Sequence, residues 1–127
     1  MRKKISNKPV LRTFALCEYV VVDKSNRFSL VNIFDKIFLP ETPAGYPFNL
    51  YVAISVDDKK HNFKVFLESP KGEETKILEV DETTKEDLYA IQVKGFFEFK
   101  DFGKYWFNIH VDDNLIGRHF FSVNKAK

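Results

Sequence analysis

Three histidines are the residues of this chain best suited to hold a metal ion or move a proton. His110 and His119 fall in two predicted strands of one hairpin, whereas His61 falls in a turn that water reaches. If the hairpin turns through two residues, Asp113 and Asn114, the two histidines are diagonal neighbours on one face. A three-residue turn would place them on opposite faces. Two ligands do not complete a zinc site, which takes three or four, so we expect no metal and no other cofactor.

The single cysteine and the paired carboxylates have structural explanations. Cys17 alternates with apolar residues along a predicted strand, which is typical of core packing. The pairs Asp57-Asp58 and Asp112-Asp113 fall in predicted turns, where aspartate caps its own backbone. The chain contains no Gly-x-Ser-x-Gly, no glycine-rich phosphate loop, no His-Glu-x-x-His and no Cys-x-x-Cys. We therefore expect no catalytic residues and a protein that is not an enzyme.

Aromatic residues exceed what one sandwich core takes up, with 14 phenylalanines among 127 residues. Phe96, Trp106 and Phe121 are predicted to point away from the core faces of their strands, and the two-residue turn pairs Trp106 with Phe121. Outward aromatic clusters mark interfaces more than surfaces exposed to water, although a terminal segment or a long loop could also cover them. The last predicted strand, 115–123, lies at or beside a sheet edge, and Arg118 is its one permanently charged residue. These features predict a homodimer or another protein partner, unless a bulge at the strand's glycine protects that edge.

Polar residues interrupt another apolar strand at Asn32 and Asp35. Polar groups within an apolar strand need hydrogen-bond partners, and the proline-rich loop 39–48 offers backbone groups nearby. In that interpretation both residues only tether the loop. The alternative is that Asn32, Asp35 and Tyr46 form a small polar site that binds a small ligand.

The elements that position these residues are all strands. Alternation of apolar and polar residues, separated by turn residues, recurs along almost the whole chain, and no long window has a helical period. The predicted fold is an antiparallel two-sheet sandwich of about eight strands, preceded by a basic tail at 1–10 and followed by a short tail at 125–127, with a single domain at 11–124. The predicted strands are 11–23, 28–38, 48–57, 62–70, 74–80, 88–99, 104–112 and 115–123.

Charge and hydropathy exclude several classes of partner. The net charge is only +2, although four cations lie in the first eight residues and two more in the last three, so the body of the domain is mildly acidic. A nucleic-acid-binding domain usually carries a basic stripe on its folded body, so we expect no nucleic-acid partner. No run approaches the roughly 20 apolar residues that span a bilayer. We therefore expect no membrane association, and the lone cysteine favours a cytoplasmic location.

Two resemblances extend this interpretation. The segment Asp101–Tyr105 resembles the tyrosine corner of immunoglobulin-like and fibronectin-like sandwiches. The segments Cys17–Asp23 and Leu30–Asp35, together with the Gly103-Lys104-Tyr105 hairpin, resemble an uncharacterised family of small bacterial β-sandwich proteins. That resemblance implies a bacterial protein without an established activity. The expected function is a non-enzymatic protein-interaction module, and the alternative is a sandwich that binds a small ligand near loop 39–48.

Overall fold

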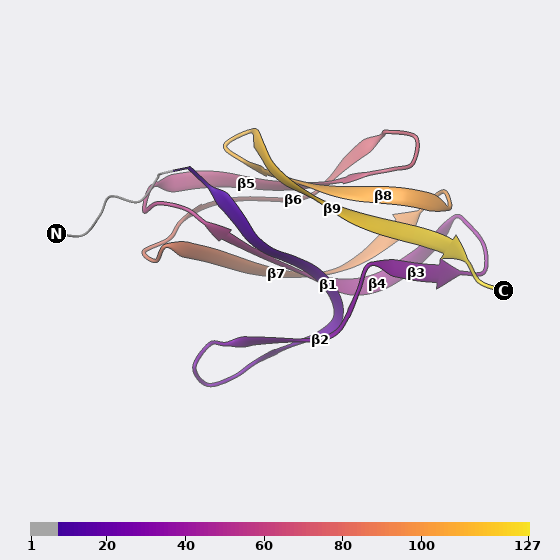
Figure 1. Cartoon of the computed structure of the whole chain (residues 1–127), viewed down its shortest axis with the longest axis horizontal. Coiled ribbons are helices and arrows are strands. Elements are labelled where there is room, and N and C mark those ends of the chain that lie inside the picture. The colour runs from indigo at the N-terminus through magenta and orange to yellow at the C-terminus, as the bar shows by residue number, and fades with distance from the viewer. Residues whose placement is uncertain (1–7) are drawn as a thin grey trace.

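The computed structural model describes residues 8–127 and arranges them as nine strands in two facing sheets (Figure 1). The first sheet has the strand order β2-β1-β4-β7, and the second has the order β3-β9-β8-β5-β6. The predicted all-β, two-sheet sandwich is confirmed. The strands are β1 (Val10–Val22), β2 (Phe28–Phe34), β3 (Lys36–Leu39), β4 (Ala44–Ser55), β5 (Lys60–Glu68), β6 (Glu74–Thr83), β7 (Leu88–Phe99), β8 (Gly103–Val111) and β9 (Asn114–Lys125).

The predicted strand 28–38 is two strands that belong to different sheets. Asp35 separates β2, at an edge of the first sheet, from β3, at an edge of the second. The backbone carbonyl of Asp35 accepts a hydrogen bond from the N–H of Ser122 at 3.0 Å, which ties the crossover to β9. Strand β3 then pairs in parallel with β9, and every other strand pair of the described residues is antiparallel.

This crossover changes the position of the last strand. Strand β9 lies between β3 and β8, so it is next to an edge and is not an edge itself. Strand β3 pairs only with Ser122–Lys125, however, so residues 114–121 of β9 have no strand partner on that side within the described residues. The prediction that the last strand lies at or beside a sheet edge is confirmed, and the homodimer predicted from it stays a prediction.

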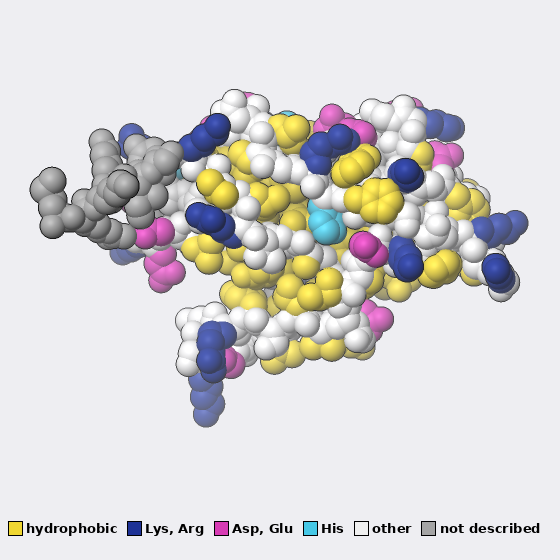
Figure 2. Space-filling view, in the orientation of Figure 1, with side chains coloured by type: hydrophobic (Ala, Val, Ile, Leu, Met, Phe, Trp, Pro, Cys, Tyr) yellow, Lys and Arg dark blue, Asp and Glu magenta, His cyan; other side chains and the backbone are white. Residues whose placement is uncertain are grey.

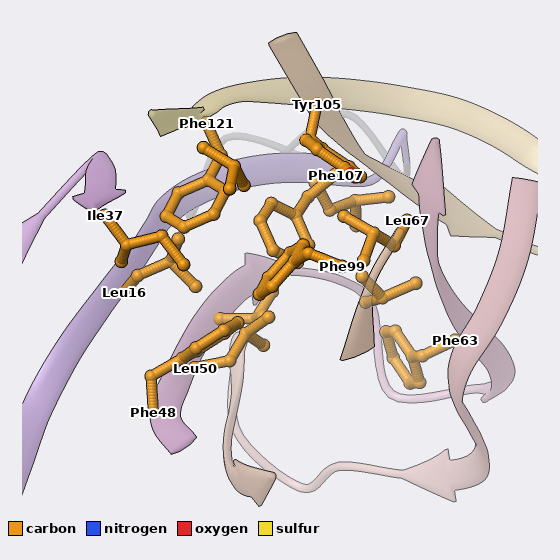
Figure 3. Packing of buried hydrophobic residues seen from close by; sticks show 14 of the residues in the cluster. Leu16, Ile37, Phe48, Leu50, Phe63, Leu67, Phe99, Tyr105, Phe107 and Phe121 are labelled. Atoms are coloured by element: carbon orange, nitrogen blue, oxygen red, sulfur yellow. The ribbon is translucent and has the colours of Figure 1, made fainter. Parts of the chain in front are cut away.

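Aromatic side chains fill the space between the two sheets (Figure 3). Phe48 and Phe99 of the first sheet meet Phe107 and Phe121 of the second, with ring centroids 6.3 Å apart for Phe48 and Phe107 and 5.7 Å apart for Phe99 and Phe121. Facing sheets lie about 10 Å apart, which leaves room for a large ring from each side. Burial of these rings explains much of the high phenylalanine content.

The turn between β8 and β9 lies one residue earlier than predicted. Asp112 and Asp113 are its two central residues, with φ angles of 51° and 65°, and both are left-handed as a tight hairpin turn requires. A β-bulge next to this turn, between the pairs His110–Leu115 and Ile109–Gly117, shifts the register by one residue, so Trp106 faces Phe120 and Phe121 faces Tyr105. The prediction that Phe121 points outward is wrong, because its side chain is fully buried in the core.

Tyr105 forms the predicted tyrosine corner. Its hydroxyl donates a hydrogen bond to the backbone carbonyl of Asp101 at 2.8 Å and accepts one from the N–H of Asp101 at 3.3 Å. The side chain is buried, and burial raises the pKa of the phenol. The corner fixes the conformation of the connection between β7 and β8, as it does in immunoglobulin-like sandwiches.

Candidate interaction surface

Strand β1 belongs to the sandwich for only half of its length. Residues Val10–Cys17 pair with β4, whereas Tyr19–Val22 pair with β2 alone. In the register of the first half, Tyr19 would face Pro47 of β4. Proline has no N–H to donate to a ladder, and the β1–β4 ladder ends just before this position.

A side chain replaces the missing ladder bond where β1 leaves β4. The Asn49 amide Nδ2 donates a hydrogen bond to the backbone carbonyl of Glu18 at 2.7 Å. Its own Oδ1 accepts a hydrogen bond from Gln92 Nε2 at 3.1 Å. Both ends of the Asn49 amide are therefore satisfied where the two strands separate.

Asn32 marks the corresponding bend in β2. Its φ of 57° is left-handed, a conformation that asparagine adopts more readily than most residues. Its Nδ2 donates a hydrogen bond to Glu18 Oε2 at 3.0 Å. The predicted tether from Asn32 to the proline-rich loop is therefore wrong, since its partner lies on the neighbouring strand.

Cys17 lies at the base of this bend and is completely buried. Burial raises the pKa of its thiol, and a hydrogen bond to the backbone of Val31 only partly offsets that effect. A thiol with a raised pKa is a poor nucleophile at neutral pH. The prediction that Cys17 packs in the interior is confirmed.

Residues 18–33 form what we call the hairpin arm, because only two strands continue beyond the bend. Figures 1 and 2 show this arm set off from the body of the sandwich. One contact back to the sheet is made near its tip, where the Phe28 ring lies 5.2 Å from the Tyr51 ring of β4. An isolated two-stranded hairpin is marginally stable in water, so the arm depends on such contacts or on a partner.

The arm exposes apolar side chains that a sandwich normally covers. Tyr19 is 61% exposed, Val21 53%, Val31 38% and Ile33 63%. Tyr19 lies directly across from Val31 in the ladder. The stretches between Glu18 and Asp23 and between Phe28 and Asp35 contain no charged residue.

These arm residues are absent from the predicted sites, although the sequence contained a signal for them. Tyr19–Val22 are four consecutive apolar residues. A strand with one solvated face should alternate instead. A continuous apolar run in an antiparallel sandwich indicates a strand with an apolar surface on both of its faces.

A groove runs between the arm and the first sheet. It has a volume of about 580 Å³, and its lining includes Val20 of the arm, Tyr46 and Pro47 of β4, and Gln92 and Lys94 of β7. A second hollow of about 460 Å³ lies on the other side of the bend. Of the residues predicted to bind a small ligand, Asn32 and Tyr46 line this second hollow and Asp35 does not.

The residues predicted to form an outward aromatic interface do not form one patch. Trp106 and Arg118 do meet, with the guanidinium carbon 4.3 Å from the centroid of the indole ring. Phe120 packs against Trp106 in the place predicted for the buried Phe121. Phe96 is 73% exposed but lies on the first sheet, with its ring over Gly45 of β4.

Arg118 is held by its own sheet. Its Nε donates a hydrogen bond to Asn108 Oδ1 at 2.8 Å, and a terminal nitrogen forms an ion pair with Glu68 at 3.1 Å. Asn108 Nδ2 donates to the same carboxylate at 3.1 Å. This network satisfies the polar groups around Trp106 within the protein.

His61 is not a solvated turn residue as predicted, because two carboxylates enclose it. Nδ1 lies 2.6 Å from Asp112 Oδ2, and Nε2 lies 2.6 Å from Asp57 Oδ1. Burial alone would lower the pKa of His61, but the hydrogen bonds and charges of Asp112 and Asp57 outweigh it and raise that pKa. The two aspartates thus do more than cap their own turns, since they join the β4–β5 and β8–β9 connections through the imidazole ring of His61.

The other two histidines lie on opposite faces of the second sheet. His110 packs against Phe66, with ring centroids 5.1 Å apart. His119 faces the core residue Phe107 in the ladder and packs against Phe14 at 4.8 Å. They cannot share a ligand, and residues 8–127 contain no cluster of three or more side chains arranged to hold a metal ion.

Two facing sheets joined through a tyrosine corner define an immunoglobulin-like β-sandwich, here with one hairpin that leaves its sheet. The chain belongs to a family of unknown function, DUF6941, which matches residues 12–124. No curated protein matches the chain. Within residues 8–127, no helix is long and apolar enough to cross a membrane.

Two solved structures show a similar chain path. An immunoglobulin-like protein from Pseudomonas aeruginosa is 12% identical, with a TM-score of 0.47, and the match covers 92% of this chain and 97% of that one. The DNA-bound alkylpurine DNA glycosylase AlkC of Pseudomonas fluorescens is 13% identical, with a TM-score of 0.49 over 71% of this chain. The matched region is only 27% of the glycosylase's length.

Proposed function

We propose that this protein is a non-enzymatic protein-interaction module whose binding surface is the hairpin arm. The observation that carries the proposal is the exposure of Tyr19, Val21, Val31 and Ile33 on a two-stranded extension of the first sheet. Exposed apolar surface of this kind costs free energy in water, and contact with a partner recovers it.

The strand edges favour the same surface. Edge strand β6 carries five charged residues, edge strand β7 carries Lys94 and Glu98, and edge strand β3 has only four residues. Strand β2 has neither a charge nor a proline. Charged, short or bulged edges resist pairing with other chains, so β2 is the least protected edge of the four, and Phe28–Val31 is its regular part before the bend at Asn32.

A photo-crosslinking residue placed in the arm tests this proposal in the organism that makes the protein. Val21 and Leu115 are both 53% exposed, so position 115 is a matched control outside the arm. We expect a crosslinked species of discrete mass from position 21 and none from position 115. Absence of such a species from position 21, or equal yields from the two positions, contradicts the proposal.

The groove supports a second candidate function, the binding of a small acidic molecule. Lys94 lines the groove and has no ion-pair partner among the described residues, and the nearby amides of Asn49 and Gln92 are held in place by each other. A screen of small carboxylic acids by NMR would test this candidate. Binding should shift the amide signals of Tyr46, Gln92 and Lys94 in the parent protein but not in Lys94→Gln, and a screen without such shifts excludes the candidate.

A further inference from the structure

The two ends of the hairpin arm carry opposite net charge. At the tip, Lys24 and Arg27 outnumber the single Asp23, whose carboxylate already pairs with Arg27 at 2.7 Å. Lys24 is therefore the extra cation of the tip. Between tip and base the arm is uncharged.

The base of the arm carries the complementary charge. Glu18 lies at the bend, where its carboxylate accepts only the neutral Asn32 amide among the described residues. No ion pair of Glu18 occurs within residues 8–127. A cation at one end and an anion at the other make the arm complementary to itself when it is reversed.

We propose that the partner of the arm is a second copy of the same arm, docked antiparallel about a two-fold axis. The inference rests on the proposed function and names the partner. The axis passes near the middle of the arm, so Tyr19, Val21 and Val31 of one copy cover the same residues of the other. Each tip then lies over the partner's base, and Lys24 of each copy meets Glu18 of the other.

The two-fold arrangement accounts for both features of the arm at once. Two-fold dimers are the commonest soluble oligomers, and each uses one self-complementary patch twice. A parallel arrangement would place like charges together at both ends, which disfavours it. The antiparallel arrangement buries the apolar middle and pairs the charges at both ends.

Sedimentation equilibrium of the full chain tests the apolar part. We expect a dimer at tens of micromolar, a monomer for Val21→Lys, and an unchanged dimer for the equally exposed Leu115→Lys. Circular dichroism of all three proteins controls for folding. A monomeric parent protein, or an equal effect of the two substitutions, overturns the inference.

A charge exchange tests the orientation. Lys24→Glu and Glu18→Lys each turn two attractive contacts of the dimer into repulsive ones, so each alone should weaken the dimer about tenfold. The double variant Lys24→Glu/Glu18→Lys should restore the parent affinity, and its dimerisation also shows that the arm is still folded. A double variant at least as weak as the singles overturns the antiparallel arrangement.

The crosslinking experiment separates this inference from the proposed function. A species of twice the chain's mass from position 21 supports both. A species of another mass, together with a monomeric purified protein, overturns the self-association and leaves the arm as a binding surface. No crosslink from position 21 contradicts both.

Discussion

The β1–β2 and β8–β9 hairpins contain similar residues but differ in what surrounds them. Both are rich in aromatic and β-branched side chains. The β8–β9 hairpin has β5 along one side and β3 along Ser122–Lys125 on the other, and one of its faces is core. The β1–β2 hairpin keeps no third strand beyond Cys17 within the described residues.

The difference teaches that an outward aromatic residue is weak evidence for an interface until its neighbours are known. Trp106 points outward, yet Arg118 covers one face of its ring and Phe120 packs beside it. Tyr19 and Val21 have no such cover and remain more than half exposed. The substitutions below should separate a hairpin stabilised by its own fold from one left free to bind.

The largest difference should come from truncating one aromatic residue in each hairpin. Phe121→Ala removes a fully buried ring and should lower the free energy of unfolding by about 3–5 kcal/mol. Tyr19→Ala removes a side chain that is 61% exposed and should change it by less than about 0.5 kcal/mol. Urea unfolding, at a concentration low enough to keep the protein monomeric, measures both. Comparable losses in the two variants would mean that the arm is packed like the core.

The next effect concerns the corner that fixes the start of the β8–β9 hairpin. Tyr105→Phe removes the hydroxyl that serves both backbone groups of Asp101, and the loss should be about 1–3 kcal/mol. Tyr19→Phe is the control, because the side chain of Tyr19 is 61% exposed and lies outside both the corner and the core. Equal urea midpoints and slopes for Tyr105→Phe and the parent protein would show that the corner does not stabilise this sandwich.

A smaller effect should come from the bend that directs the arm away from its sheet. Asn32→Ala places an alanine at a left-handed φ of 57° and removes the hydrogen bond to Glu18, which should cost about 1–2 kcal/mol. Asn32→Gly removes the same hydrogen bond without the backbone strain, so it should be the more stable of the two. Thermal unfolding compares them directly. If alanine is tolerated as well as glycine, the left-handed conformation does not hold the bend.

The pH dependence of stability should differ in sign between two histidines. The folded-state pKa of His61 is raised above 6.5, so its stabilisation is fully present below 6.5 and is lost as the pH rises through the folded value. The pKa values of Asp57 and Asp112 are lowered, so the stabilisation that these two carboxylates contribute is lost only in acid, as the pH falls through their folded-state pKa values. His61→Asn should flatten the fall in stability on the alkaline side, and urea unfolding over a pH series measures it.

His119 is the opposite case and serves as the comparison. Burial lowers its pKa below 6.5, so the folded state resists protonation and loses stability as the pH falls through 6.5. His119→Gln should remove that acid-side loss and leave the alkaline side unchanged. If the free energy of unfolding depends on pH with the same slope in both histidine variants, neither histidine environment is as described.

The sequence was sufficient to predict the sandwich, because the patterns that indicate its strands and turns are local. Period-2 alternation and turn residues located the strands, and the segment Asp101–Tyr105 predicted the corner. The position of one turn was not decided by local pattern, since Asp112-Asp113 and Asp113-Asn114 are both acceptable turn residues. The β-bulge after that turn adds one residue to β9 and so reverses the faces of the residues beyond it, which is why Phe121 lies in the core and not on the surface.

The candidate surface depends on contacts between distant segments, which a single sequence does not display. Pro47 fell within the predicted loop 39–48, and the sequence did not identify it as the point opposite which β1 leaves β4. The His61 cluster joins Asp57 to Asp112 across separate turns. Both arrangements follow from the strand order, which became known only with the fold.

Residue-resolved hydrogen exchange at a series of protein concentrations tests most directly whether the arm is where this protein meets its partner. If arms pair as proposed, amides of Phe28–Val31 and Tyr19–Val22 should exchange more slowly as the concentration rises into the tens of micromolar. The amides of β8, which pairs with β5 on one side and β9 on the other, should exchange at constant rates. Exchange in the arm that is independent of concentration, with slowing elsewhere on the surface, would contradict the account.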